Sequence, residues 1–583
     1  MHEAPRRVVK RRGPAAALLA AVLSAPWSVE AGAAAPAEGT TGAQPLRLAA
    51  SDALGYVVVP DLEVLLAHVD AAGSAIAPGA LPPGAAREGL AQKLGVAGLE
   101  GLAARPILLV LLKGQGPMAP PRPVLFLPVK DAKAYPTTIA NLGWTSRSAP
   151  GLLIAASTPD GLAASGPLEA EYRRITGAGI GHDLRVFLEM GRLMDAYGPL
   201  MQMGMDAAMA PKPSPGPEQK GAGPTPGAAA LLKVETKAFV ALLGQIDEVQ
   251  WDMDLQGEGL VSDTVLTART GTALQDLARM PPAGSNRAAA LLSGSGLMTA
   301  AYQLDPARLA AFMGAIVRES ASDPAAAGVL TPDVLALIGQ AATTYGGQAA
   351  YRMAAAPGGR LNVEAVVEVT DEARAMAMVE KGLSLVAPGG AWATLLEDSH
   401  VSMALQKGMR RHAGVAVHRL TVKAAGKALT AAEEKAAQAP FLRDTEFAIT
   451  RGYYVSAQDA AAMDALIDRA AASAPAEGLT LRSAQAFGEG RHGYVDYDVI
   501  GLMKAVSSVA PANKGAPNPF AALPDSGDPM LSAVTFADGR IRWQSKLPLR
   551  SFALVSETAK KAAPSPAPSP KAAPSPSAPR RRP

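Results

Sequence analysis

The chain has 583 residues, of which 49% are hydrophobic, and it contains no cysteine. This length is enough for two or three domains that each bury a core, and the lack of cysteine excludes disulfide bonds and a lipid anchor on an N-terminal cysteine. The formal net charge is +3, but the first 31 residues carry +3 and residues 558–583 carry +6, so the body between them carries −6. An acidic body without a basic stripe argues against nucleic acid as a partner.

Residues 1–31 are predicted to be a signal peptide. A basic segment from Arg6 to Arg12 precedes a short apolar run from Ala15 to Ala25, and Val29-Glu30-Ala31 then fits the small-x-small pattern of a cleavage site. An uncleaved membrane anchor is the alternative, but the apolar run is too short to span a bilayer. We therefore expect an exported protein, periplasmic or extracellular, with residues 32–45 as a flexible linker.

The rest of the chain contains no apolar run of about eighteen residues, which a transmembrane helix requires. The most apolar stretch, Pro106 to Leu112, has the length of a strand. No transmembrane segment is therefore predicted after the signal peptide.

Several short blocks recur in the same order in the two halves of the chain. Strands that lead into a helix capped by Asp occur at Leu54–Asp61 and again at Leu297–Asp305. Two hairpins end the halves, one turning near Gly257 and the other at Asp538-Gly539. Further matches pair residues 124–134 with 366–374, 151–160 with 452–459, and 186–194 with 495–503. Because the order is shared, the sequence predicts two diverged copies of one unit.

The predicted units comprise residues 46–285 and 286–556. The spacing between matched blocks changes twice, which places about 60 extra residues in the second copy between Asp371 and Gly452, and about 30 in the first copy after Met194. The second of these insertions includes residues 211–227, whose Pro and Gly content predicts a disordered loop. Residues 557–583, rich in Pro, Ser and Ala with a basic end, are predicted to be a disordered tail. A solvated spacer is favoured there over an adhesive segment for surface polyanions.

Many segments alternate apolar and polar residues, which is typical of half-buried strands. Examples are residues 249–255, 361–369, 415–422, 491–499 and 534–544. Helices are expected at Pro306–Val317 and Gln458–Ala472. The predicted fold class is α+β, with two homologous tandem units that each hold a largely antiparallel sheet with helices packed on one face.

The segment from Leu48 to Asp61 (LAASDALGYVVVPD) resembles a group of exported bacterial proteins catalogued only as a domain of unknown function. Members of that group open with a Leu-Pro-Ala-Asp-like stretch, a Tyr-Val strand and a helix that starts at Asp. Residues 122–131, 151–157 and 183–194 are similar to the same group. The resemblance implies an exported, envelope-associated protein, and it supplies no activity, cofactor or catalytic residue.

No catalytic, cofactor or metal residue is predicted. Glu397 to His400 places acid, nucleophile and base side by side, but triads are assembled from distant segments, so a polar turn is favoured. His412 and His418 lack a third ligand nearby, which favours structural histidines over a zinc site. Asp496 and Asp498 share a strand face, where a solvated surface is favoured over a cation site. Ser293–Gly296 and Gly177–Gly181 match the hydrolase elbow and the dinucleotide loop incompletely.

Methionines between residues 190 and 209 offer the sharpest alternative, because thioethers bind Cu(I). Met190, Met194, Met201, Met205 and Met209 follow helical spacing, interrupted only by Pro199, which favours the buried stripe of a helix over copper binding. The sequence therefore predicts a non-enzymatic exported binding or structural module. The alternatives are a carrier or chaperone for an apolar ligand in a groove or inter-domain crevice, and an enzyme whose site one sequence does not reveal.

Overall fold

The computed structural model describes residues 47–562, with gaps inside that range. The gaps are residues 78, 80–81, 95, 97, 117–118, 132–134, 142, 210–225, 258, 322–328, 357–359, 394–400, 425–442, 473–477 and 510–519. The predicted signal peptide and linker, residues 211–225 of the predicted loop and residues 563–583 of the predicted tail lie outside the described residues. So does the Glu397–His400 segment.

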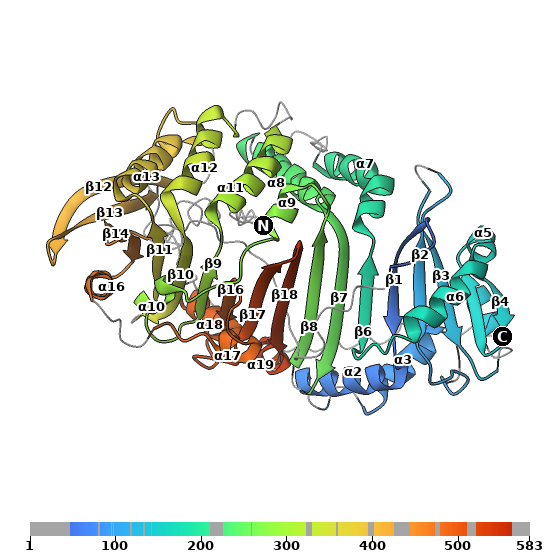
Figure 1. Ribbon diagram of the computed structural model, residues 1–583. Coiled ribbons are helices and arrows are strands. Elements are labelled where there is room, and N and C mark those ends of the chain that lie inside the picture. Colours follow the sequence, from blue (N-terminus) through green and yellow to red (C-terminus); the bar gives the residue numbers. More distant parts are fainter. Residues whose placement is uncertain are drawn as a thin grey trace, which may run out of the picture.

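All eighteen named strands of the described residues form one sheet, and every strand pair in it is antiparallel (Figure 1). The strands of the first half are β1 (Ala53–Val59), β2 (Ile107–Leu112), β3 (Arg122–Pro128), β4 (Thr145–Ala149), β5 (Leu152–Ala156), β6 (Leu184–Leu188), β7 (Ile246–Gln256) and β8 (Gly259–Ala268). They lie side by side in the order β4-β5-β3-β2-β1-β6-β7-β8.

The second half continues the same sheet with ten strands. They are β9 (Met298–Gln303), β10 (Tyr345–Ala356), β11 (Arg360–Val369), β12 (Val401–His412), β13 (Val415–Ala424), β14 (Thr445–Thr450), β15 (Tyr453–Ala457), β16 (Gly493–Tyr497), β17 (Met530–Ala537) and β18 (Arg540–Pro548). Their order is β12-β13-β14-β15-β11-β10-β9-β16-β17-β18. Apart from the β12–β13 hairpin, this is the strand order of the first half.

Strands β8 and β18 join the two halves. Their register runs from Gly259 opposite Pro548 to Thr267 opposite Arg540, with Asp263 opposite Gln544 at its centre. The halves therefore share one hydrogen-bonded sheet. The prediction of a separate sheet in each unit is therefore wrong, because β8 and β18 join the two sheets edge to edge.

Helices cover both faces of the sheet, which we call the α6 face and the α2 face. On the α6 face lie α5 (Pro159–Ala163), α6 (Ser165–Thr176), α10 (Arg287–Leu291), α16 (Ala460–Ala471) and α17 (Arg482–Phe487). In the first half this face holds a core around Tyr56, Phe126 and Leu168, and in the second half a core around Val366, Val455 and Met463.

The α2 face carries the remaining helices. They are α2 (Leu62–Ile76), α3 (Ala85–Leu94), α4 (Pro136–Asn141), α7 (Met190–Met209), α8 (Pro226–Gly244), α9 (Ala273–Leu277), α11 (Pro306–Ala321), α12 (Pro332–Thr344), α13 (Glu372–Val386), α18 (Val499–Val509) and α19 (Leu549–Ala562). The expectation of helices on one face alone is wrong. The reason is visible in β5, where Leu153 and Ala155 are buried on one side and Ile154 and Ala156 on the other. Strands with two apolar faces must be covered twice.

The centre of the α6 face is different, because none of the described helices lies over β7, β8 and β18 there (Figure 1). On the opposite face two helix pairs pack near the joint: α2 packs on α19, and α11 packs on α9. Each pair contains one helix from the first half and one from the second (Figure 1). These contacts tie the halves together beyond the sheet itself.

Several local predictions are confirmed by the hydrogen bonds at helix starts. Asp61 accepts from the backbone N–H groups of Glu63 and Val64 at 2.9 and 3.1 Å, and Asp305 accepts from that of Arg308 at 3.0 Å. The hairpin turn at Asp538-Gly539 has positive φ at both residues, 52° and 75°, which is the geometry that two-residue hairpins favour.

Two predicted boundaries shift by a few residues. Helix α8 begins at Pro226, inside the predicted loop, because Pro is accommodated at the first position of a helix. Helix α19 continues to Ala562, six residues into the predicted tail.

Methionines on α7 point into a core on the α2 face. Met190 and Met194 are 6% and 8% exposed, and Met201 packs against the same cluster, which also contains Ile246 from β7. Met203 is 60% exposed, as a residue out of phase with the stripe should be. The side chains of Met205 and Met209 lie outside the described residues. For Met190, Met194 and Met201, the geometry is that of core packing.

We expect Met194→Ala to lower the free energy of unfolding by about 2–5 kcal/mol, because truncating a buried side chain loses its contacts and leaves a cavity. Met203→Ala is the matched control on the same helix and should change it by less than about 0.5 kcal/mol. Urea unfolding of the two variants measures both values. Equal effects would contradict the assignment of the buried stripe.

Candidate functional site

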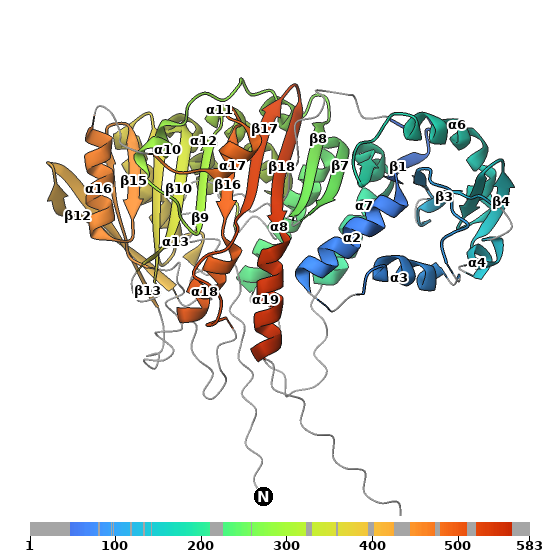
Figure 2. The ribbon, with the colours of Figure 1, turned by 90° about the horizontal axis from the view of Figure 1, so that it is seen from below.

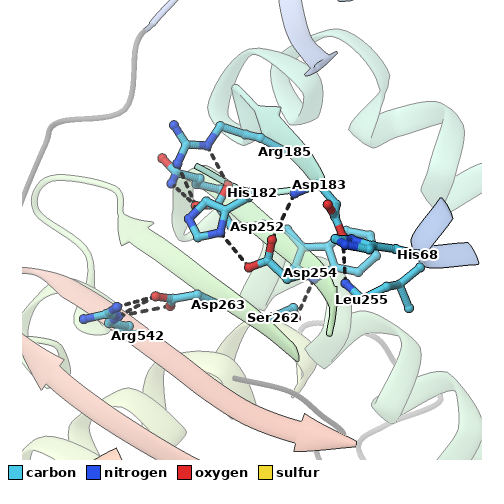
Figure 3. Close-up of polar contacts among 12 residues, drawn as sticks. His68, His182, Asp183, Arg185, Asp252, Asp254, Leu255, Ser262, Asp263 and Arg542 are labelled. Carbon is cyan, nitrogen blue, oxygen red and sulfur yellow. Dashed lines mark hydrogen bonds and ion pairs between the residues drawn. The ribbon is translucent and has the colours of Figure 1, made fainter. Parts of the chain in front are cut away.

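Charged side chains gather at the uncovered centre of the α6 face (Figure 3). Side chains alternate between faces along a strand, so Asp252 and Asp254 of β7 point to the same side. Asp252 has a cross-strand neighbour on each flanking strand. Arg185 lies opposite it on β6, and Asp263 lies opposite it on β8. The sheet register therefore brings these groups together from three strands.

Arg185 and Asp252 form the centre of this cluster. The Arg185 Nε and Nη2 atoms donate to the two carboxylate oxygens of Asp252 at 2.5 and 2.8 Å, which is a bidentate pair. The side chain of Gln250 donates to the same carboxylate at 2.7 Å. Three hydrogen bonds from protein donors thus bind the Asp252 carboxylate.

Two histidine–carboxylate pairs lie where β6 begins and β7 ends. His182 Nδ1 is 2.8 Å from Asp254 Oδ2, and His68 Nδ1, on α2, is 2.7 Å from Asp183 Oδ2. The pairs are linked, because the Asp183 N–H donates to Asp254 at 3.0 Å, and the Leu255 N–H donates to Asp183 at 2.9 Å. Together they fix α2 to the start of β6 and the end of β7.

An ion pair between the halves lies beside the joint. Arg542 of β18 donates from Nε to both carboxylate oxygens of Asp263 of β8, at 3.0 and 2.8 Å. A contact from Nη2 to Asp263 completes the fork. This pair adds a charged link to the backbone hydrogen bonds between β8 and β18.

In each of these pairs the base is more exposed than the acid. The side chains of Arg185, His182 and Arg542 are 18%, 29% and 39% exposed, whereas those of Asp252, Asp254 and Asp263 are 6%, 10% and 12% exposed. The carboxylates therefore lie against the strands, and the cationic groups lie over them and face the solvent.

The His182–Asp254 pair shifts the pKa of both groups. The hydrogen bond to Asp254 raises the pKa of His182, and although burial opposes this shift, the nearby charge of Asp252 adds to it. Burial alone would raise the pKa of Asp254, but the hydrogen bonds from His182 and from the Asp183 N–H outweigh it, so the pKa is lowered. Both shifts favour the charged pair.

The chemistry of the cluster is that of ion pairing. In a Ser-His-Asp triad the histidine bonds to a nucleophile as well as to a carboxylate. The hydrogen bonds found for His182 and His68 in the described residues go to carboxylates. No group of three or more His, Asp or Glu side chains within the described ranges is arranged to hold a metal ion.

Two shallow hollows lie outside this cluster. One, of about 690 Å³, lies between β4 and the helices α5 and α6, and the other, of about 480 Å³, lies along α17. Both are open to solvent. Neither contains a residue of the charged cluster.

The predicted carboxylates Asp496 and Asp498 are buried, so the expectation of a solvated strand face is wrong. Asp496 accepts from the N–H groups of Arg482 and Ser483 at the start of α17, at 2.5 and 2.9 Å. Asp498 accepts from those of Gly501 and Gly527 at 2.9 and 3.1 Å. Each carboxylate serves a different set of backbone donors, which explains their burial.

His412 and His418 point to opposite faces of the β12–β13 hairpin. His412 lies 2.8 Å from Asp468 of α16, on the α6 face, whereas His418 stacks on Phe447 with ring centroids 5.1 Å apart. A shared metal site between them is therefore ruled out by the register. The interpretation of both as structural histidines stays a prediction.

The two glycine-containing segments are connections in the fold. Gly177 ends α6, and residues 178–181 lead from there to β6. Gly294, with φ of 72°, precedes β9 and bridges to Leu479.

The charged cluster was not identified from the sequence. The signal was present in β7, where Asp252 and Asp254 alternate with apolar residues, and in the neighbouring His182 and Arg185. The sequence does not show which strands lie beside β7, and the cluster depends on those neighbours. Partners such as Arg542 are separated from it by nearly 300 residues of chain.

No family model matches this chain, and comparisons with curated proteins and with solved structures find no match either. The resemblance to the group of unknown function stays a prediction. Among the described residues, no helix is both long and apolar enough to cross a membrane.

A buried histidine in the second half provides a contrast to His182. His492 Nε2 donates to the carbonyl oxygen of Pro281 at 2.8 Å, and its Nδ1 accepts from the Phe536 N–H at 3.1 Å. These partners require the neutral ring. Burial lowers the pKa of His492, although the bond to Pro281 partly opposes the shift.

We expect the two histidines to stabilise the fold over opposite pH ranges. The raised pKa of His182 means that its contribution is full below about pH 6.5, the unfolded value, and is lost as the pH rises through the folded value. The lowered pKa of His492 means that its contribution is present above about pH 6.5 and is lost as the pH falls through the folded value.

Urea unfolding of His182→Gln and His492→Gln between about pH 5.5 and 8.5 measures this, and each variant serves as control for the other. The destabilisation should shrink with rising pH for His182→Gln and with falling pH for His492→Gln, by about 1 kcal/mol in each case. A His182→Gln penalty that grows with pH would contradict the ion pair with Asp254.

Proposed function

We propose that this chain is an exported, non-enzymatic binding or structural module of the cell envelope. The observation that supports it best is the central cluster, in which the carboxylates Asp183, Asp252, Asp254 and Asp263 are bound by basic side chains or backbone N–H groups. These contacts hold β6, β7, α2 and the two halves in place. Their chemistry is used for stability, and the surface they build is a rigid polar strip.

A polar strip on a continuous sheet suits the binding of a partner by its surface. The strip lies between α6 on one side and α17 on the other, and Arg542, His182 and Arg185 form its outer layer. The carrier alternative calls for an enclosed apolar groove. The hollows at β4 and α17 are open, which favours surface binding over a carrier.

We also propose that the two halves are diverged copies of one unit. The shared strand order supports this, because β4-β5-β3-β2-β1-β6-β7-β8 corresponds to β14-β15-β11-β10-β9-β16-β17-β18. The β8–β18 register and the two helix pairs near the joint are arranged as in a two-fold symmetric dimer, with the axis near Asp263 and Gln544.

The two insertions expected from the sequence fit this proposal. The hairpin of β12 and β13 falls between Asp371 and Gly452 and has no counterpart among the described residues of the first half. In the first half, α7 and α8 stand where the second half has the shorter α18. Each insertion lengthens one copy without changing the order of the shared strands.

The proposal is tested on protein matured in its own host and purified from the envelope without denaturation. Native mass spectrometry should show a mature chain that begins at Gly32. It should also show a bound macromolecular partner, and the chain should stay folded after that partner is released. A stoichiometric small apolar molecule would instead support the carrier alternative. An uncleaved chain that begins at Met1 and stays in the cytoplasm would contradict export.

A further inference from the structure

The sheet ends in two strands that are each paired on one side in the described residues. Strand β4 pairs with β5 and β12 pairs with β13, and these two strands lie at opposite ends of the molecule (Figure 2). An edge strand presents a row of backbone donors and acceptors that another strand can use. Of the two edges, β4 borders an open hollow.

The edge of β4 borders the open hollow on the α6 face. Thr145 and Arg147 face this hollow, because they lie opposite Ala156 and Ile154 of β5, whose side chains join the core under α6. The hollow has a volume of about 690 Å³ and is lined by Thr145, Arg147, Pro159, Leu162, Ala163, Gly166 and Glu169. It is a groove that runs between the edge strand and two helices.

The corresponding place in the second half is filled by the chain itself. The two halves can be aligned on their hairpin turns, Pro150-Gly151 between β4 and β5 and Arg451-Gly452 between β14 and β15. In this alignment β14 is the counterpart of β4, and it pairs with β13. Arg410 of β12 reaches over this pair to Glu446, Asp464 and the carbonyl oxygen of Ala460. Val417 of β13 is fully buried there against α16.

The same positions in the first half have a different chemistry. Counting from the turns, Glu446, Ala460 and Asp464 correspond to Thr145, Pro159 and Ala163, so the two acids that hold Arg410 are absent. Arg147 is already bound by Glu169 and Ser165, at 2.6 and 2.9 Å. The groove therefore fits a strand with short, uncharged side chains instead of a basic one.

We propose that the outer edge of β12 from a second copy of this chain docks on β4, at residues Val401–Gln406. This goes beyond the proposed function, because it concerns contacts between copies. Residues 401–406 (VSMALQ) carry no charge, and Ala404 and Gln406 are exposed on the α6 face. The uncharged stretch that could pair with β4 ends at Gln406. A bulge follows it, and basic residues begin at Lys407.

The geometry of the sheet supports a head-to-tail contact. The sheet has eighteen strands in alternating direction, so β4 and β12 run oppositely. A second copy placed at the end of the first, with its α6 face on the same side, then brings the two edges together in antiparallel orientation. Full self-pairing of two β4 strands would place Arg147 opposite Arg147, which is unfavourable.

Sedimentation velocity over increasing concentrations of the mature full-length protein tests this. The wild type should associate beyond the dimer, because a head-to-tail contact leaves both ends open. Thr145→Lys on β4 and Ala404→Lys on β12 should each lower the association constant at least about tenfold, since each places a charge in the contact. Ala537→Lys, an exposed strand position at the β17–β18 turn, is the matched control and should associate like the wild type.

Mixing the two edge variants gives the sharpest outcome. Each retains one intact edge, so an equimolar mixture of Thr145→Lys and Ala404→Lys should form a dimer and nothing larger. A wild type that stays monomeric at all concentrations would overturn the proposal. Dimers of Ala404→Lys alone would overturn it too, because they would show self-pairing of β4 or a contact elsewhere.

Discussion

Strand β8 pairs with β18 over nine residues, and this pairing determines how every other part of the molecule is placed. Without it each half would expose a long central strand as an edge, a state that proteins avoid. With it the two halves form one sheet, and the helices that follow β8 and β18 are carried across to pack on the opposite half. The α2–α19 and α11–α9 pairs are consequences of this arrangement.

The charged cluster depends on the same constraint. Its ion pair between Asp263 and Arg542 exists only because the last strands of the two halves are neighbours, and the cluster continues from there through Asp252 and Arg185 to the histidine pairs. Bidentate Arg–carboxylate pairs fix the geometry of the groups they join, and removing one partner of a buried pair is strongly destabilising. The proposed role is therefore the binding of a partner by the surface of the sheet.

The sequence predicted more of the fold than of the site. Caps such as Asp61, hairpin turns such as Asp538-Gly539 and the strand-sized run before Leu112 are local features, and short-range physics determines them. The order of recurring blocks predicts two copies of one unit, and the shared strand order is consistent with that proposal. The joint could not be predicted, because nothing local shows which strand lies beside β8. The cluster assembles across that joint and across β6–β7, so it was missed. Asp496 and Asp498 were misjudged because the alternation of β16 does not show that backbone N–H groups at the start of α17 and at Gly527 bind them.

Hydrogen exchange along β8 tests the central claim most directly. In a continuous sheet, the amides of Gly259–Ala268 bond either to β7 or to β18, so a peptide spanning them should be as protected as one spanning β7. The outer strand β4 provides the internal comparison, because part of its amides face away from β5. A continuous sheet predicts slow exchange throughout β8. Rapid exchange of about half of its amides, as in an edge strand, would contradict the joining of the halves through β18.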